Sequence, residues 1–184
     1  MLKKFVQFLG VETKPSAAVL AAEPETESVR HIIQSLDALA PTQAHYIALF
    51  ASILSRVAHA DLTIAPEESQ AIEKIVQELG GLTASQAVLV TEIAKQQNRL
   101  LGGVENYLLT REFAKVASQA QRLQLLESLF AVAAAEAGIS AEENQEINKI
   151  AEEIGLTRQD FLAVRASFKE HLNVLKGKEL LPLE

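Results

Sequence analysis

The feature that most constrains the fold of this chain is an internal duplication. When the sequence is aligned with itself at an offset of 75 residues, residues 54–80 match residues 129–155 at 13 of 27 positions without a gap. The tripeptide Gly-Leu-Thr ends both copies, at 81–83 and at 155–157. Each copy has the pattern of an apolar helix, an acidic loop, a second helix, a short turn and a third helix. A long unit that occurs only twice favours two pseudo-symmetric halves of one bundle over a solenoid of many repeats.

Helix signals run along the whole chain after residue 27. Glycine and proline number only eight and five among 184 residues, so few residues interrupt a helix. Ser140 with Glu143, and Thr83 with Gln86, have the spacing of a capping box. Thr42 and Thr157 are also suited to cap helix N-termini. No strand-like alternation persists, so we predict an all-α compact helical bundle. Its eight helices are expected near 28–39, 42–60, 66–80, 83–99, 103–118, 119–137, 141–154 and 157–174.

The bundle is expected to occupy residues 28–176, followed by a tail at 177–184. Residues 1–9 form a short amphipathic helix, because Leu2, Phe5, Val6 and Leu9 share one face. Residues 10–27 contain two prolines and four glutamates without a sustained period, and are interpreted as a linker. Two roles are open for 1–9. The segment either makes peripheral contact with a membrane or a partner, or it packs on the bundle or stays disordered.

Composition excludes several classes of function. The chain has 17 basic and 24 acidic residues, a formal net charge of −7, so nucleic-acid binding is not expected. It has no cysteine, which excludes disulfides, thiol chemistry and the common zinc knuckles. No apolar run approaches the ~18 residues of a membrane span, and residues 1–10 lack the pattern of a secretory signal. These features are consistent with a cytoplasmic protein.

The two acidic loops resemble the second half of a calcium loop. In the first copy Asp61 is followed by Ile64 and Glu68, and in the second copy Glu136 is followed by Ile139 and Glu143. An EF-hand also needs ligands at its first and third positions and a glycine at its sixth. Val57 and His59 occupy those first positions in the first copy, and Leu62 occupies the glycine position. The second copy fails in the same way, so an EF-hand is excluded.

Two interpretations of the acids remain open. Loops related by a pseudo-twofold axis would pool four carboxylates, from Asp61, Glu68, Glu136 and Glu143, around one divalent cation such as Ca²⁺, Mg²⁺, Mn²⁺ or Zn²⁺. Alternatively, the acids only start helices, because first-turn carboxylates stabilise the helix dipole and cap free N–H groups. His59 is a candidate additional ligand but has Ala134 as its repeat equivalent. No role is assigned to His31, His45 or His171.

The duplicated acid-x-x-Ile-x-x-x-Glu loop between helices resembles the tellurite-resistance TerB family and its TerB-like relatives. The resemblance covers about residues 28–172 and is clearest over 122–165, with Ala135-Glu136, Ile139, Glu143 and Asp160-Phe161. It implies a bundle of two pseudo-symmetric halves whose paired acids chelate metal. It also implies membership of cytoplasmic, membrane-associated stress-response complexes. Both loops depart from the family pattern, because neither has glycine directly after the first acid.

Three functions follow from these observations. The first is a non-enzymatic TerB-like module that holds a divalent cation and docks a protein partner. The second is a purely structural adaptor whose acids cap helices. The third, an enzyme, is not expected, because no hydrolase triad, phosphate loop or cysteine nucleophile is present.

Overall fold

A computed structural model describes residues 2–10, 27–57, 66–96, 106–135 and 138–173. Over these ranges the fold is all-α, as predicted, and the β-structure is limited to one isolated bridge. The predicted linker at 10–27 and tail at 177–184 lie mainly or wholly outside the described residues. The helices are α1 (Leu2–Phe8), α2 (Glu27–Asp37), α3 (Pro41–Leu54), α4 (Pro66–Glu78), α5 (Ala84–Lys95), α7 (Asn106–Val116), α8 (Gln119–Ala135), α9 (Ala141–Glu153), α10 (Arg158–Ser167) and the 3₁₀ turn η2 (Lys169–His171).

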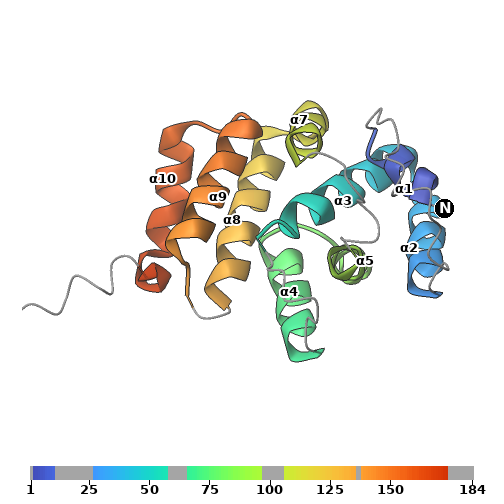
Figure 1. Ribbon diagram of the computed structural model, residues 1–184, viewed down its shortest axis with the longest axis horizontal. Helices are drawn as coiled ribbons and strands as arrows, with labels where there is room; N and C mark the ends of the chain where they lie inside the picture. The colour runs from blue at the N-terminus through green and yellow to red at the C-terminus, as the bar shows by residue number, and fades with distance from the viewer. Residues whose placement is uncertain (1, 11–26, 58–65, 97–105, 136–137, 174–184) are drawn as a thin grey trace, which may run out of the picture.

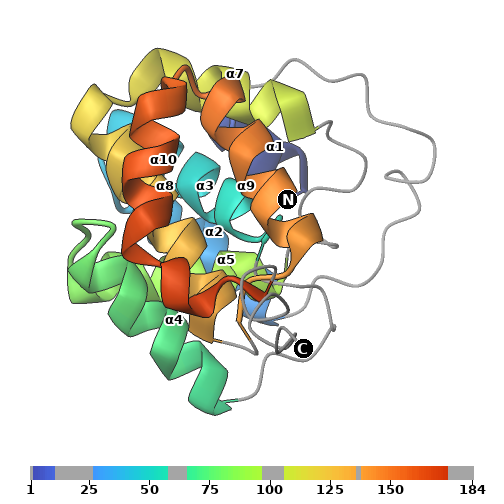
Figure 2. The ribbon, with the colours of Figure 1, turned by 90° about the vertical axis from the view of Figure 1, so that its left-hand side faces the viewer.

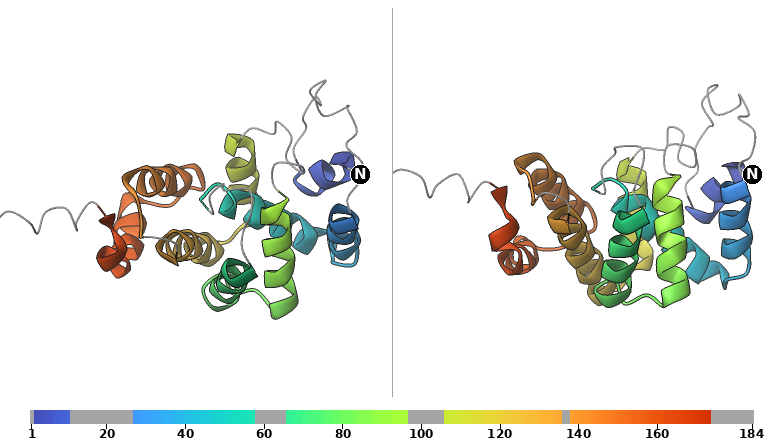
Figure 3. Two further views of the ribbon diagram at one scale, coloured as in Figure 1. Left: turned by 60° about the horizontal axis from the view of Figure 1, so that its bottom comes forward. Right: turned by 90° about the horizontal axis from the view of Figure 1, so that it is seen from below.

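The helices are arranged around α3, which crosses the middle of the molecule (Figure 1). At one end α8, α9 and α10 pack against one another, and at the other end α1 and α2 contact α3. Seen from the α10 end, α9 and α10 lie in front of α3 (Figure 2). Helices α4 and α5 pack together along a third side (Figure 3). Every described helix is too short or too polar to traverse a lipid bilayer.

Side-chain caps fix where several helices begin. The side chains of three cap residues, Thr83, Ser140 and Thr157, each accept a hydrogen bond from the backbone N–H three residues later. In return, the side chain of that later residue accepts a hydrogen bond from the backbone N–H of the cap residue. These capping boxes confirm three of the four predicted caps. The prediction for Thr42 is wrong, because α3 begins at Pro41 after Ala40 and has no side-chain cap. A proline at the first helical position has no N–H to satisfy, so this start needs less capping.

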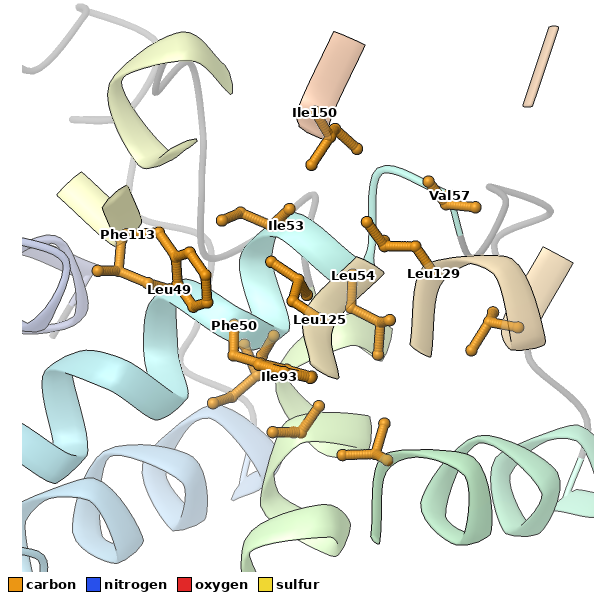
Figure 4. Close-up of a cluster of buried hydrophobic side chains, with 14 of the residues drawn as sticks. Leu49, Phe50, Ile53, Leu54, Val57, Ile93, Phe113, Leu125, Leu129 and Ile150 are labelled. Carbon is orange, nitrogen blue, oxygen red and sulfur yellow. The ribbon is translucent and has the colours of Figure 1, made fainter. Parts of the chain in front are cut away.

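The core is built on α3, which is apolar on nearly every side. Phe50, Ile53 and Leu54 are fully buried and belong to a cluster that also includes Leu125 and Leu129 of α8 (Figure 4). Helices α3 and α8, the apolar helices that precede the two acidic loops, are in contact. Ser52 is also buried, and its hydroxyl donates to the Ala48 carbonyl at 2.7 Å. A helix buried all round needs such internal hydrogen bonds, because an unpaired hydroxyl in the core is costly.

The two sequence copies differ in their packing. In the second copy α9 packs against α8, the helix that precedes it. In the first copy α4 packs mainly against α5 and against α8 of the other copy, rather than against α3. The pseudo-twofold relation between the copies therefore stays a prediction.

The helix ends that differ most from prediction are those of α3 and α10. Helix α3 ends at Leu54 rather than at residue 60, and Ser55–Val57 form a turn. Helix α10 ends at Ser167 rather than continuing to 174, and η2 follows it. Beyond η2, Leu172 forms a parallel bridge with Ile139. Pairing with a distant backbone segment has replaced the continuation of the helix.

Candidate functional site

The structure describes only part of the predicted metal site. Asp61 and Glu136 lie outside the described residues, and so does His59. Glu68 lies in the first turn of α4, but its side chain is outside the described part. Glu143 lies in the first turn of α9 and is fully described. The structure therefore does not describe how the four carboxylates lie relative to one another. Among the described residues there is no group of three or more metal-binding side chains.

Glu143 shows what one of these acids does. Its side chain is buried, with 8% of the residue exposed. Its Oε2 accepts from the Ser140 N–H at 2.8 Å, while the Ser140 hydroxyl accepts from the Glu143 N–H at 3.1 Å. No further hydrogen bond to this carboxylate comes from the described residues. The cap therefore uses one oxygen and leaves Oε1, so capping and metal ligation by Glu143 are chemically compatible.

A short segment near the C-terminus holds the end of the second acidic loop. The Ile139 N–H donates to the His171 carbonyl at 2.7 Å, and the Asn173 N–H donates to the Ile139 carbonyl at 3.0 Å. The Asn173 amide also donates to the Gly138 carbonyl at 3.3 Å. Ile139 itself is fully buried. The loop end is thus fixed through its backbone, which the sequence analysis did not foresee.

Gly138 supplies a left-handed backbone conformation in this loop, with φ of +89°. A Cβ at this position would lie 2.6 Å from Asn173 Oδ1 and 3.0 Å from the His171 carbonyl oxygen. Only glycine combines this φ with so close an approach at little cost. The family pattern places its glycine directly after the acid, and here Gly138 comes one residue later. The first copy has Thr63 at the equivalent position, outside the described residues.

A buried ion-pair cluster joins the two sequence copies. Arg56, at the end of α3, has a side chain only 2% exposed. It donates to Glu146 Oε1 at 2.9 Å and to Glu153 Oε2 at 3.1 Å, both on α9. Glu153 also accepts from the Thr110 hydroxyl on α7 at 2.8 Å. Arg56 is the one charged residue in its apolar stretch, and pairing with these acids offsets the cost of burying it. Its repeat equivalent is Ala131, so this cluster is not duplicated.

The ion-pair cluster ties the turn after α3, which precedes the first acidic loop, to the second and last turns of α9, which follows the second acidic loop. Arg56 lies five residues before Asp61 in the sequence, and Glu146 lies three residues after Glu143. Five residues span at most ~18 Å, and three residues of helix rise ~4.5 Å. The tie between Arg56 and Glu146 therefore sets only an upper limit on the distance from Asp61 to α9, and Asp61 itself lies outside the described residues.

A cavity of about 610 Å³ opens elsewhere, between α3, α5, α7 and α8. Its polar lining is uncharged and comes from Thr42, Gln43, His45, Tyr46, Gln86 and Gln121. Burial raises the pKa of Tyr46 to about 12, so the phenol remains protonated near neutral pH. Burial also lowers the pKa of His45, against the opposing attraction of Glu112. His45 was given no role from the sequence, because it has no acid-rich neighbourhood there.

The fold and the site define a helical, all-α module in which a helix–acidic loop–helix unit occurs twice. The family model described as tellurite resistance protein TerB matches residues 46–166. This match spans α3 to α10 with both acidic loops and covers more than half of the chain, so the chain belongs to the TerB family. Comparisons with curated proteins and with solved structures give no significant match.

Proposed function

We propose that this chain is a non-enzymatic TerB-like module that holds one divalent cation between its acidic loops and docks a protein partner. The observation that carries the metal site is the Arg56–Glu146 tie, which holds the turn before the first acidic loop against the second turn of α9. The ligands would be Asp61, Glu68, Glu136 and Glu143. An all-carboxylate set suits hard cations such as Ca²⁺, Mg²⁺ or Mn²⁺ better than it suits Zn²⁺.

The buried carboxylate of Glu143 supports this proposal. It keeps one oxygen outside its capping bond, and a metal would neutralise acids that otherwise repel one another in a chain of net charge −7. The TerB family is generally non-catalytic, in agreement with the lack of catalytic motifs in the sequence. Family membership also suggests a cytoplasmic stress-response complex as the setting, in which the partner would be found.

The test is thermal unfolding with each cation in excess and again with chelator. A ligand that binds only the native state raises the melting temperature by mass action, so a metal-dependent rise is expected for the native sequence. The Glu68→Gln/Glu143→Gln pair should lose that rise, whereas Glu142→Gln, an exposed neighbour in the same turn, should keep it. Glutamine at 143 still offers an oxygen to the Ser140 N–H, so the cap is largely preserved.

The alternative function is a structural adaptor in which the acids serve only as caps. The capping box of Ser140 and Glu143 is the structure that this alternative function requires, and it is also compatible with metal binding. It predicts that no cation changes the melting temperature and that the melting temperature of the Glu68→Gln/Glu143→Gln pair is the same with and without chelator. That combined result would eliminate the metal site while leaving partner docking in place.

Peripheral contact of residues 1–9 with a membrane is a further part of the proposal. In the described state Phe5 and Leu9 are fully buried against the bundle, so such contact requires α1 to leave its place. Co-sedimentation with anionic vesicles should therefore be stronger for the full chain than for a chain lacking residues 1–27. Equal sedimentation of the two would rule out this contact.

A further inference from the structure

The turn that follows helix α1 lies directly on the imidazole of His45. Gly10, which follows the helix, has φ of +64°. A Cβ at Gly10 would lie 2.6 Å from His45 Cε1 and 3.2 Å from Nε2. The backbone of Gly10 therefore covers this edge of the ring. In Figure 1 the same helix lies beside α3, the element that carries His45.

The covered edge of His45 contains an unpaired polar atom. Nε2 is buried and has no hydrogen-bond partner in the described part of the chain. A neutral imidazole tolerates one unpaired nitrogen, although at some cost. An imidazolium must donate from both nitrogens, and burying a charge without a partner costs much more. Closure of Gly10 over the ring is therefore compatible with the neutral form and opposed by the charged form.

Among the described residues, the charged groups around His45 do not compensate for this burial. Glu112 and Lys115, both on α7, act on the ring with opposite signs and are paired with each other. From α1 the contact is made by Gly10, which carries no charge. The lining that α5 and α8 contribute near the ring is uncharged, with Gln86 and Gln121. Burial outweighs Glu112 and holds the pKa of His45 below its ordinary value of 6.5.

Helix α1 is attached weakly enough to be released. It has seven residues, far fewer than an isolated helix needs to be stable in water. Its described buried contacts are those of Phe5 and Leu9, and it packs mainly against α3. Residues 11–26 separate it from α2 along the chain, so its departure does not require α2 to move. Release would give His45 Nε2 access to water.

We propose that α1 is an acid-released latch, in which protonation of His45 displaces Gly10 from the imidazole and detaches α1 from α3. This device is independent of the metal site. Released, α1 exposes Phe5 and Leu9, and the surface of α3 beneath them becomes accessible.

The direction of the pH effect follows from proton linkage. The docked state holds a lowered pKa at His45, so the released state binds more protons. Docking is therefore complete above pH ~6.5 and weakens as the pH falls below that value, by up to about tenfold for each pH unit until the docked pKa is passed. The ring neighbours Glu112, Lys115 and the N-terminus of α3 whether α1 is docked or released. Protonation of His45 is therefore coupled to release through the change in solvation of the ring that Gly10 causes.

The test uses a fluorescent reporter in α1 of the full chain. The protein has no tryptophan, and Phe8 is a partly buried residue of α1, so Phe8→Trp introduces a single emitter. Acrylamide quenching of this tryptophan is measured from pH 8 to pH 5, with circular dichroism at each point to establish that the bundle stays helical. Quenching should rise below pH ~6.5, and it should stay flat when His45→Gln is added, because glutamine does not titrate.

A second measurement uses the reciprocal effect on His45. Its Cε1–H signal in NMR, assigned by its loss in His45→Gln, should titrate below the ordinary range in the native sequence. Phe5→Ala, which removes a buried contact of α1 without adding a charge near the ring, should raise that pKa toward 6.5. Equal rises of quenching with and without His45, or a His45 pKa that Phe5→Ala leaves unchanged, would overturn the latch.

Discussion

At the residue scale, Arg56 is the side chain with the largest consequence for stability. A guanidinium removed from water is stabilised only by hydrogen-bonded partners, and Arg56 has them in Glu146 and Glu153, 90 and 97 residues away in the sequence. Its fork of donors suits two carboxylates at once. The cluster fixes the end of α3 against α9 in one register, because neither acid can be left unpaired without loss.

Removing this guanidinium should destabilise the fold strongly. Arg56→Ala leaves Glu153, whose side chain is 12% exposed, without its cation, and we expect a loss of about 3 kcal/mol in the free energy of unfolding. Arg56→Lys should restore only part of it, because an ammonium cannot reproduce the fork. Urea denaturation measures both. Arg111→Ala, an exposed arginine on α7, is the control and should change stability by less than ~0.5 kcal/mol. A loss for Arg56→Ala no larger than that of the control would contradict this assignment.

At the element scale, the helices were largely predictable because their signals are local. Thr83, Ser140 and Thr157 start helices through contacts three residues away, and such spacing is visible in the sequence. The end of α10 was not predictable in this way. It depends on Leu172 and Asn173 pairing with Ile139, more than thirty residues earlier. The partners of Arg56 and the burial of His45 were hidden for the same reason, since each depends on an element distant in the sequence.

Of the four acids predicted to bind metal, Glu143 alone has a described side chain, and it combines burial with capping.

The capping box of α10 makes the stability of that helix depend on pH. Hydrogen bonds from the Thr157 side chain and backbone lower the pKa of Asp160 below 3.8. The unfolded chain therefore binds a proton more readily, and the stabilisation is present above pH ~3.8 and is lost as the pH falls below it. The stability advantage of the native sequence over Asp160→Asn should be largest above pH ~5 and should shrink toward pH 3. Chemical denaturation across this range measures it, and an advantage independent of pH would show that the carboxylate charge is not involved.

At the scale of the whole molecule, one hydrophobic cluster runs from α1 to α10. Phe5 of α1, Phe50 of α3 and Phe161 of α10 belong to the same contiguous core. The ion-pair cluster of Arg56 adds a polar connection between the two sequence copies. A core shared in this way gives neither copy a separate interior of its own.

The two copies should therefore unfold together. Native-state hydrogen exchange should give the amides of Leu54 in α3 and of Ile150 in α9 the same limiting free energy of opening, equal to that of global unfolding. Both residues are fully buried, which makes them matched probes. A lower plateau for Ile150 than for Leu54 would indicate that α8–α10 open as an independent unit.

The bridge between Ile139 and Leu172 also sets an order of events during synthesis. A ribosome delivers the chain from its N-terminus, so Ile139 emerges well before Asn173, whose N–H it binds. Until then the end of the second acidic loop lacks its backbone partners, although the helices on either side of it can already have formed. The nascent chain thus completes the first copy of its repeat before the loop of the second copy can settle. A stall between those two points would leave the end of the second acidic loop without the backbone bonds that fix it.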